Sequence, residues 1–351
     1  MTTPLRILYV GTLNEGGTCV QRMRTLIRLG HEVTPIDKVP GALAARRLTF
    51  PWRVRNRLFG ARDESQANER MLRLPGALSP DILWIDKGLT IRPETLLALR
   101  ARWPEMLTLS YAGDDMFNPR NQSPQWRGCL PLHDLHVTTK SFNVQELLAA
   151  GARDVVFTGK GFSPEVHRPL PVSDADRIRF GGTVGFIGWP ERERERSMRH
   201  LARHGIDVRV WGPWPKWKSA LNLRVEGEPL WSDDYARAIA AFDINLCFLR
   251  KVNRDRHTTR SVEIPACGGF MLGERTEEHE ALFAEGIEAD YFGSDEEMLA
   301  KVKLHLAHPE ERRRMAAAAL ARCHRDGYSN AARLTTILEY CRSRRARAIA
   351  A

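Results

Sequence analysis

Apolar and polar stretches alternate along the chain in an order that predicts strands and helices in turn. A first apolar run, Ile7–Val10, is followed by a glycine-rich loop. Apolar positions then recur at helical spacing from Val20 to Leu29, and a second apolar run follows at Val33–Ile36. This order predicts a βαβ unit, whose right-handed crossover places the two strands in a parallel sheet.

The loop after the first expected strand contains Gly11, Asn14, Gly16 and Gly17. These glycines approximate a phosphate-binding fingerprint but lack the Gly-x-Gly-x-x-Gly spacing of dinucleotide-binding folds. The pattern therefore gives little support to a nicotinamide cofactor, and we expect no cofactor.

The same alternation continues through the first half of the chain. Further strands are expected at 81–86, 107–111, 136–140 and 155–157. Asp114 and Asp115 follow the strand 107–111, and acids at the carboxyl end of a strand lie where open α/β sheets bind ligands. One of the two is our candidate catalytic base or acceptor-orienting acid. The alternative is an aspartate that stabilises a turn or a helix N-terminus.

Residues 169–181 have the composition of a linker, with two prolines, a serine and several charges. A second α/β pattern starts with the apolar run 183–187 and continues to about residue 330. We therefore expect two domains, each with a parallel sheet. The predicted boundaries are 1–168 for the first domain, 169–182 for the linker, 183–330 for the second domain and 331–351 for a C-terminal helix.

The stretch 255–275 combines a polar segment, a short helix, a glycine stop and a buried strand. Thr259 is expected to cap the start of the helix. Pro265 is expected in the first helical turn, where a proline is tolerated. Gly268 and Gly269 are expected to end the helix in a positive-φ conformation.

Arg256, Arg260 and Glu263 then lie near the start of this helix. Guanidinium groups bind phosphate oxygens in a bidentate manner, so two arginines suit a diphosphate. A carboxylate in the same place accepts hydrogen bonds from sugar hydroxyls. The alternative for Glu263 is an acid that the helix dipole favours near the N-terminus.

The amino-acid composition argues against a membrane-spanning, zinc-binding or disulfide-rich protein. The chain is 43% hydrophobic and 27% charged, which is typical of a soluble globular protein. No apolar run is long enough to span a bilayer. The six cysteines are scattered without a Cys-x-x-Cys pair, which argues against a zinc site and a disulfide framework. We therefore expect a reduced, cytoplasmic protein.

The net charge of +10 suits nucleic acid, anionic lipid or a phosphorylated substrate. The basic residues are spread along the chain, and no nucleic-acid-binding motif is present, so nucleic acid is not expected. Residues 42–73 interleave arginines with aromatic and aliphatic side chains. Such a segment can lie on an anionic membrane surface, but Pro51 interrupts a long amphipathic helix, which favours packing on the domain.

A Pro-rich loop follows the strand expected at 208–211 and contains Trp214. A flat indole ring at the end of a strand can stack on a nucleobase. The alternative is a ring that packs beneath the turn.

The pattern Arg260-x-x-Glu263-x-x-Ala266-Cys267-Gly268-Gly269, followed by a short strand, resembles the donor-binding motif of GT-B glycosyltransferases. The resemblance is closest to the CgeB-like, spore-maturation-type branch with a glycosyl transferases group 1 C-terminal domain. It implies two Rossmann-like domains whose parallel sheets face each other across a cleft. It also implies sugar transfer from a nucleotide-sugar to an acceptor hydroxyl, without a bound metal.

The resemblance assigns roles to particular residues. Glu263 matches the acid that holds the ribose, whereas Asp255 stands where the family has a glutamate near the transferred sugar. Gly188 and its loop would pass beneath the donor phosphates, with Arg192 or Arg194 as the arginine of that loop. The loop from Gly11 to Gly17 would help to hold the acceptor, and the C-terminal helix would cross back onto the first domain.

The expected partners are a nucleotide-sugar donor and a glycan, lipid-linked or small-molecule acceptor, with peripheral contact at the inner face of a membrane as a further expectation. Two other functions stay open. The first is a nucleotide-sugar epimerase or hydrolase on the same fold. The second is a non-catalytic protein that binds nucleic acid or an anionic surface through its positive charge.

Overall fold

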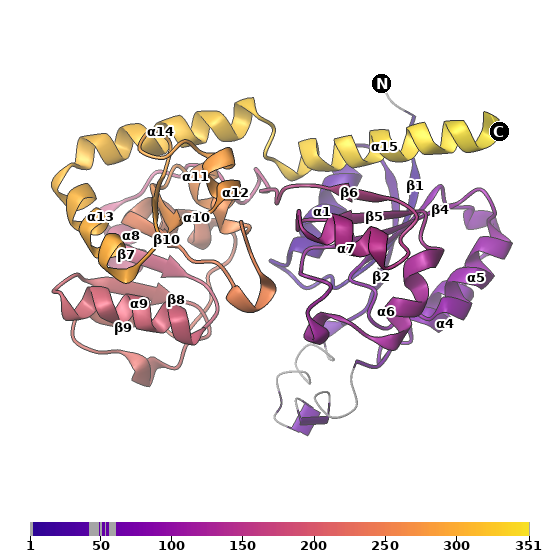
Figure 1. Ribbon diagram of the computed structural model, residues 1–351, viewed down its shortest axis with the longest axis horizontal. Helices are drawn as coiled ribbons and strands as arrows, with labels where there is room; N and C mark the ends of the chain where they lie inside the picture. The colour runs from indigo at the N-terminus through magenta and orange to yellow at the C-terminus, as the bar shows by residue number, and fades with distance from the viewer. Residues whose placement is uncertain (1–2, 42–48, 50, 53, 56–60, 351) are drawn as a thin grey trace. The chain divides into compact units, whose positions relative to one another are not determined.

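The computed structural model describes residues 3–41, 49, 51–52, 54–55 and 61–350 (Figure 1). The chain forms two compact units. Unit 1 combines the N-terminal part up to Gly159 with the C-terminal segment that starts at Asn330, and unit 2 extends from Lys160 to Ser329. Residues 42–48, 50, 53 and 56–60 of the basic segment 42–73 lie outside the described residues, and its predicted membrane contact stays a prediction.

Unit 1 contains a six-stranded parallel sheet in the order β2-β1-β3-β4-β5-β6. Ile7 pairs with Val33 on one side and with Ile82 on the other, so β1 lies inside the sheet. The strands are β1 (Arg6–Gly11), β2 (Glu32–Asp37), β3 (Ile82–Asp86), β4 (Leu107–Ala112), β5 (Leu135–Thr138) and β6 (Val155–Phe157). The helices are α1 (Thr18–Arg28), α4 (Ala67–Leu72), α5 (Pro93–Arg102), α6 (Pro124–Cys129), α7 (Asn143–Ala149) and α15 (Asn330–Ala350).

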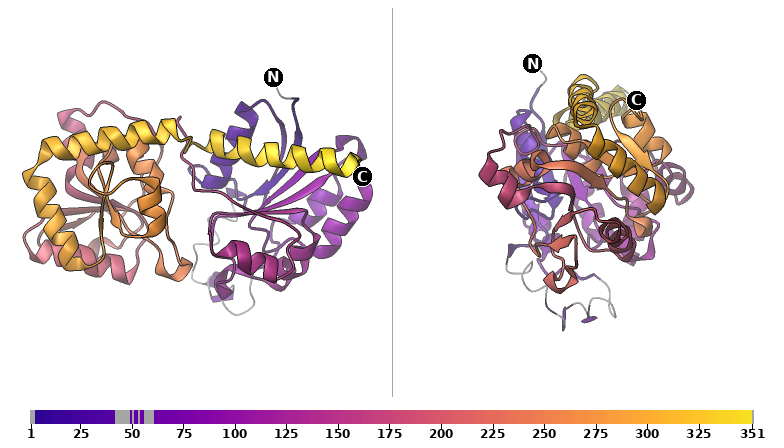
Figure 2. Two further views of the ribbon diagram at one scale, coloured as in Figure 1. Left: turned by 45° about the horizontal axis from the view of Figure 1, so that its top comes forward. Right: turned by 90° about the vertical axis from the view of Figure 1, so that its left-hand side faces the viewer.

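Helices cover both faces of this sheet, which is why its inner strands β1, β3, β4 and β5 are buried along almost their whole length. On one face, Leu334 and Leu338 of α15 share a core with Ile7 and Trp84 of the strands. On the other face, α4 and α5 pack against the alternate strand residues. The C-terminal helix α15 thus belongs to unit 1, although unit 2 precedes it in the chain (Figure 2).

Unit 2 repeats the architecture with the strand order β12-β11-β10-β7-β8-β9, again all parallel. The strands are β7 (Gly182–Ile187), β8 (Val208–Trp211), β9 (Leu223–Val225), β10 (Phe242–Cys247), β11 (Met271–Glu274) and β12 (Asp290–Phe292). The helices are α8 (Asp174–Phe180), α9 (Arg192–Arg203), α10 (Ser232–Ala241), α11 (Arg260–Ala266), α12 (Glu277–Leu282), α13 (Asp295–Ala307) and α14 (Pro309–Arg325).

Two local features differ from the expectations. Residues 169–182 lie inside unit 2, where Ser173 and Asp176 form a capping box at the start of α8. Pro265 lies in the second turn of α11 and not in the first. Because α11 ends at Ala266, the proline at this place interrupts only the end of a short helix.

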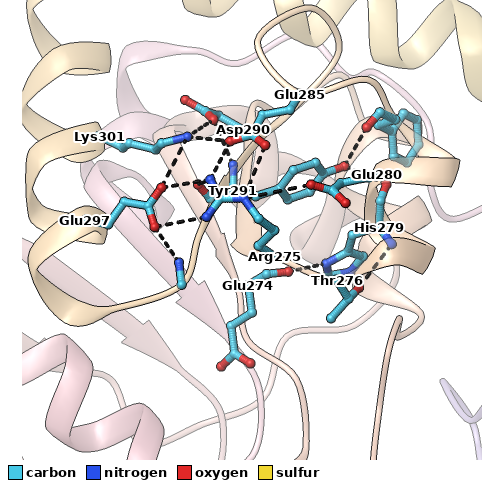
Figure 3. A network of polar contacts seen from close by, with 12 residues as sticks. Glu274, Arg275, Thr276, His279, Glu280, Glu285, Asp290, Tyr291, Glu297 and Lys301 are labelled. Carbon is cyan, nitrogen blue, oxygen red and sulfur yellow. Dashed lines mark hydrogen bonds and ion pairs between the residues drawn. The ribbon is translucent and has the colours of Figure 1, made fainter.

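An ionic network joins β11, β12 and α13 in unit 2 (Figure 3). Arg275 binds Glu297 at 2.7 Å and donates to the carbonyl of Tyr291 at 3.0 Å. Asp290 accepts hydrogen bonds from Lys301 and from His305, whose Nε2 lies 2.7 Å from Oδ2. Burial opposes the charge of Asp290, but these hydrogen bonds outweigh it and lower its pKa to about 2.

The lowered pKa makes the stability of unit 2 depend on pH. Above the ordinary aspartate pKa of 3.8 the network stabilises the fold, and this contribution is lost as the pH falls toward 2. We expect Asp290→Asn to lower the free energy of unfolding by about 2 kcal/mol at pH 7. In urea titrations, the difference from the unchanged protein should shrink between pH 4 and pH 2.

Glu339→Gln is the matched control, because Glu339 is an exposed acid on α15 in unit 1. Its effect should be within about 0.5 kcal/mol at every pH. An equal loss of stability in the two variants would contradict the role given to Asp290.

Candidate functional site

The turn after β7 is built around Gly188. Its N–H donates to the carbonyl of Trp211 at 2.9 Å, and its carbonyl accepts the indole N–H of Trp214 at 2.7 Å. A Cβ on Gly188 would lie 2.8 Å from Nη2 of Arg260. A Cβ on Gly212 would lie 2.1 Å from the carbonyl oxygen of Gly188. Glycine at both positions therefore lets the backbone and a guanidinium group approach closely.

Two arginines from different helices meet at this turn. The guanidinium carbons of Arg194, on α9, and Arg260, at the start of α11, lie 5.5 Å and 5.7 Å from the ring centroid of Phe186. Arg260 also donates through Nε to the carbonyl of Ile187. Arg194 donates to the carbonyl of Trp189 at 3.1 Å. The shared aromatic ring and the two carbonyls hold two like charges at one place.

The electrostatics of this arginine pair (Arg194 and Arg260) favour an anion. Arg194 is only 3% exposed, and its Nε and Nη2 have no hydrogen-bond acceptor. Burial and then the positive charge of Arg260 lower the pKa of Arg194 to about 10. Glu191 is the nearest acid, but its carboxylate lies 3.7 Å from Nη2. An oxyanion beside the pair would accept from these donors and offset the repulsion.

The sequence did not decide whether Arg192 or Arg194 points toward the turn after β7, and the structure shows that they differ in burial. Arg192 is exposed at the first position of α9, whereas Arg194 is buried against the turn. The alternation of Glu and Arg hides this difference in the sequence, because only the helical phase decides which side chain points inward.

Glu263 is buried in α11 and is held by two groups that the sequence analysis did not identify. The hydroxyl of Tyr235 donates to Oε2 at 2.8 Å. Nε2 of His167 lies 3.6 Å from Oε1. The backbone N–H of Ser163 donates to Nδ1 of His167 at 3.0 Å, so the imidazole proton lies on Nε2 and faces the carboxylate. In the sequence, His167 stands in a His-Arg-Pro run just before the expected linker, and that position alone assigns it no role.

Burial keeps both partners of Glu263 neutral. It raises the pKa of Tyr235 well above 10, with the charge of Glu263 adding to the effect. Burial also lowers the pKa of His167, against the opposing effect of Glu263. Tyr235 thus donates a hydrogen bond to the carboxylate, and the neutral His167 lies close to its other oxygen. The carboxylate keeps lone pairs for further hydrogen bonds.

The two glycines after α11 have different roles. Gly268 has a φ of +76°, as expected for a helix stop. Gly269 does not have a positive φ, which corrects the prediction. A Cβ there would lie 2.5 Å from Cγ2 of Ile239, so close packing explains this glycine. Thr259 precedes α11 but makes no capping hydrogen bond through its side chain.

The segment before α11 is fixed by local contacts. Asp255 accepts from the Asn253 amide at 2.6 Å and from the backbone N–H of Arg250 at 3.4 Å. Arg256 is exposed, and its carbonyl accepts from the hydroxyl of Thr276. These contacts give Asp255 a loop-forming role, and its predicted contact with the transferred sugar stays a prediction.

Trp214 has the packing role that was the alternative to stacking on a nucleobase. Its ring is buried in the core of unit 2, edge-on to Phe186 at 6.3 Å between centroids. Because its indole N–H donates to Gly188, the side chain supports the turn that holds the arginine pair. A buried ring leaves no face for a nucleobase.

Asp114 and Asp115, in unit 1, differ in their burial and in their contacts. Asp115 is buried, and its Oδ1 accepts from the N–H of Phe117 and the amide of Asn143, both at 3.0 Å. It stabilises the turn, which is the alternative considered for it. Asp114 is half-buried and forms an ion pair with Nζ of Lys87 at 2.5 Å. Lys87 has a φ of +45°, a strained conformation that directs its side chain from the end of β3.

The predicted glycine loop is a tight turn between β1 and α1. The N–H of Gly17 donates to the carbonyl of Asn14 at 3.0 Å, and Gly16 has a φ of +76°. A Cβ on Gly11 would lie 2.9 Å from the ring of Tyr9. This turn and Asp114 both follow parallel strands, so they lie at the same edge of the sheet of unit 1.

Within the described part of the chain, no three His, Cys, Asp or Glu side chains are grouped so that they could hold a metal ion. A helix of the length and apolarity needed to cross a membrane is likewise missing from these residues.

Comparisons with known proteins cover the part of the chain that contains this site. The family described as "Glycosyl transferase-like" matches residues 192–339, which include the arginine pair and Glu263. No curated protein matches the chain.

Solved structures match nearly the whole chain at low identity. Anabaena Alr3699/HepE, in complex with UDP and glucose, is 13% identical, with a TM-score of 0.64 over 97% of this chain and 100% of that one. A glycosyltransferase from Rickettsia africae is 13% identical, with a TM-score of 0.65 over 97% and 99%. The sucrose-phosphate synthase from Thermosynechococcus elongatus is 11% identical, with a TM-score of 0.68 over the same shares.

These likenesses confirm the predicted α/β fold of the GT-B type, with a parallel six-stranded sheet in each unit. The family match confirms a glycosyltransferase-like domain in the second half of the chain.

Proposed function

We propose that this protein transfers a sugar from a nucleotide-sugar to an acceptor hydroxyl, and that the arginine pair binds the donor diphosphate. The observation that carries the proposal is the pair of unsatisfied donors, Nε and Nη2 of Arg194, beside the guanidinium of Arg260. A diphosphate presents several oxygens and two negative charges, so it suits two forked cations.

The proposed role of the arginine pair follows from the negative charge that develops on the leaving diphosphate. During transfer, the bond between the anomeric carbon and the phosphate oxygen breaks, and negative charge accumulates on the leaving diphosphate. Guanidinium groups that are already positioned stabilise that charge without reorganisation, and burial strengthens the effect. We propose that they supply the positive charge that a metal ion supplies in other enzymes.

Glu263 is proposed to accept hydrogen bonds from the ribose hydroxyls. Its carboxylate is oriented by Tyr235 and His167, which act as positioning residues. Structures similar to this chain were determined with UDP-glucose and with UDP, so uridine nucleotides are the first donors to test. We also propose placement in the CgeB-like branch, which the Arg260–Gly269 motif supports most specifically.

In unit 1, Asp114 is the proposed base. The acceptor oxygen forms the new bond to the anomeric carbon, and its proton passes to the carboxylate of Asp114. Lys87 orients this carboxylate through their ion pair. Asp115 accepts hydrogen bonds within its turn and is not proposed as a base.

We also propose a cytoplasmic location, because all six cysteines are unpaired.

An epimerase or a hydrolase would use the same nucleotide site. Incubation with UDP-sugar alone separates these functions, because a transferase then yields little free UDP and no altered sugar, whereas either alternative consumes the donor.

Arg194→Gln should weaken binding of UDP by about tenfold or more, because charge-assisted hydrogen bonds to phosphate are lost. The ligand-free variant should be as stable as the unchanged protein or more so, because a buried charge facing Arg260 is removed. Calorimetry in EDTA measures the affinity without divalent metal, and thermal unfolding measures the stability.

Arg192→Gln is the control for this experiment, since Arg192 lies exposed on the same helix. It should leave the affinity for UDP unchanged. The proposal would be contradicted by equal losses in the two variants, or by unchanged binding in Arg194→Gln.

Glu263→Gln keeps the shape of the side chain and removes its charge. UDP affinity should fall by about tenfold or more, because the hydrogen bonds between the carboxylate and the ribose weaken. The unchanged protein should bind 2′,3′-dideoxy-UDP weakly, whereas the variant should hardly distinguish the two nucleotides. If the losses of affinity from the substitution and from removal of the hydroxyls are not additive, the hydroxyls contact Glu263. If the two losses are additive, the ribose lies elsewhere.

Asp114→Asn should reduce the rate of transfer by about a hundredfold or more while UDP binding is unchanged, because the variant cannot accept the proton. Asp115→Asn should instead lower thermal stability, because Asp115 holds a buried turn. Full transfer activity in Asp114→Asn would exclude Asp114 as the base.

A further inference from the structure

The three most exposed large hydrophobic side chains of the described residues lie on, or beside, the loop between β8 and β9 of unit 2. Leu221 is 87% exposed, Trp217 is 80% exposed and Ile178 is 79% exposed. Ile178 belongs to α8, and the other two belong to the loop between β8 and β9. Ile178 and the neighbours of Leu221 line one surface hollow of about 500 Å³. We call Ile178, Trp217 and Leu221 the apolar corner.

The loop that carries Trp217 is held in place by the body of unit 2. Its tip is a short 3-10 turn, Lys216–Lys218, and the loop extends beyond the rest of the unit in Figure 1. Lys218 is paired with Glu195 of α9, and Arg199 donates to the carbonyl of Lys218 at 3.0 Å. The exposure of Trp217 is therefore a property of an anchored loop and not of a fraying end.

The loop of the apolar corner carries three positive side chains and no negative one. Residues 215–224 contain Lys216, Lys218 and Arg224 and no acidic side chain. Acids outside the loop lie nearby: Glu226 pairs with Arg224, Glu195 pairs with Lys218, and Asp207 lines the hollow together with Ile178. Lys216 is exposed next to Trp217. Nζ of Lys218 lies 5.5 Å from the Trp217 ring, so a cation accompanies the aromatic ring at the tip.

The size of this surface favours a lipid bilayer over a protein partner. A stable protein interface buries about 800 Å² on each side, and three side chains at a protruding corner cover only a fraction of that. Insertion into a membrane interface needs few apolar side chains when basic residues contact anionic headgroups. Tryptophan suits the boundary, because its ring is apolar and its N–H can remain hydrated.

We propose that the apolar corner docks the protein on a bilayer that contains anionic lipid, with Trp217 and Leu221 entering the interface and Lys216 and Arg224 contacting headgroups. The surface is distinct from the arginine pair and uses none of the residues assigned to the donor. Vesicle binding and nucleotide binding can therefore fail independently of each other.

Co-sedimentation of the full-length protein with vesicles tests the proposal. The protein should bind vesicles of phosphatidylcholine mixed with phosphatidylglycerol, and not vesicles of phosphatidylcholine alone, with binding that weakens as salt is raised. The affinity of the double variant Trp217→Ser, Leu221→Ser for the mixed vesicles should be lower by about tenfold or more. Ile287→Ser is the control, because Ile287 is 65% exposed elsewhere in unit 2, and it should bind normally.

Quenching of tryptophan fluorescence by brominated phosphatidylcholine in the mixed vesicles shows which ring is inserted. The fluorescence of the unchanged protein should be quenched on binding. This quenching should be largely lost in Trp217→Phe, which keeps an apolar side chain and should still bind. UDP affinity and thermal unfolding show that each variant is folded. The proposal is overturned if the unchanged protein does not bind the mixed vesicles, if the double variant binds as well as the control, or if Trp217→Phe is quenched as strongly.

Discussion

Two like charges held against one aromatic ring are the constraint around which unit 2 is arranged. Arg194 and Arg260 both lie beside the ring of Phe186, and the fold keeps them there although burial and repulsion both oppose the charge of Arg194. An arrangement that is unfavourable in the free protein points to a ligand that makes it favourable. A Cβ at position 188 would crowd both the ring of Phe186 and the guanidinium of Arg260, so glycine suits this place.

The surrounding structure supports this arrangement from several elements. Parallel strands bring the turn after β7 and the segment before α11 to the same edge of the sheet, where open α/β folds bind ligands. Trp214 and Gly212 fix the turn, while Tyr235 and His167 fix the carboxylate of Glu263. The residues proposed to touch the donor are thus few, and each is positioned by neutral or apolar neighbours.

Much of this could be predicted from the sequence. The alternating apolar runs predicted parallel sheets, because each inner strand is covered on both faces. The Arg260–Gly269 motif predicted two of the residues that are now proposed to bind the donor, Arg260 and Glu263. The choice between Arg192 and Arg194 could not be predicted, because it depends on the rotation of α9. The roles of Trp214 and Asp115 depend on burial, and those of His167 and Tyr235 on contacts between residues distant in sequence, which local patterns do not reveal.

The most direct measurement of the central claim is a crystal structure of the protein with UDP bound. The account predicts that phosphate oxygens lie within hydrogen-bond distance of Nε and Nη2 of Arg194 and of the guanidinium of Arg260, with the ribose at Glu263. A nucleotide bound elsewhere, with those nitrogens of Arg194 still lacking an acceptor, would contradict it.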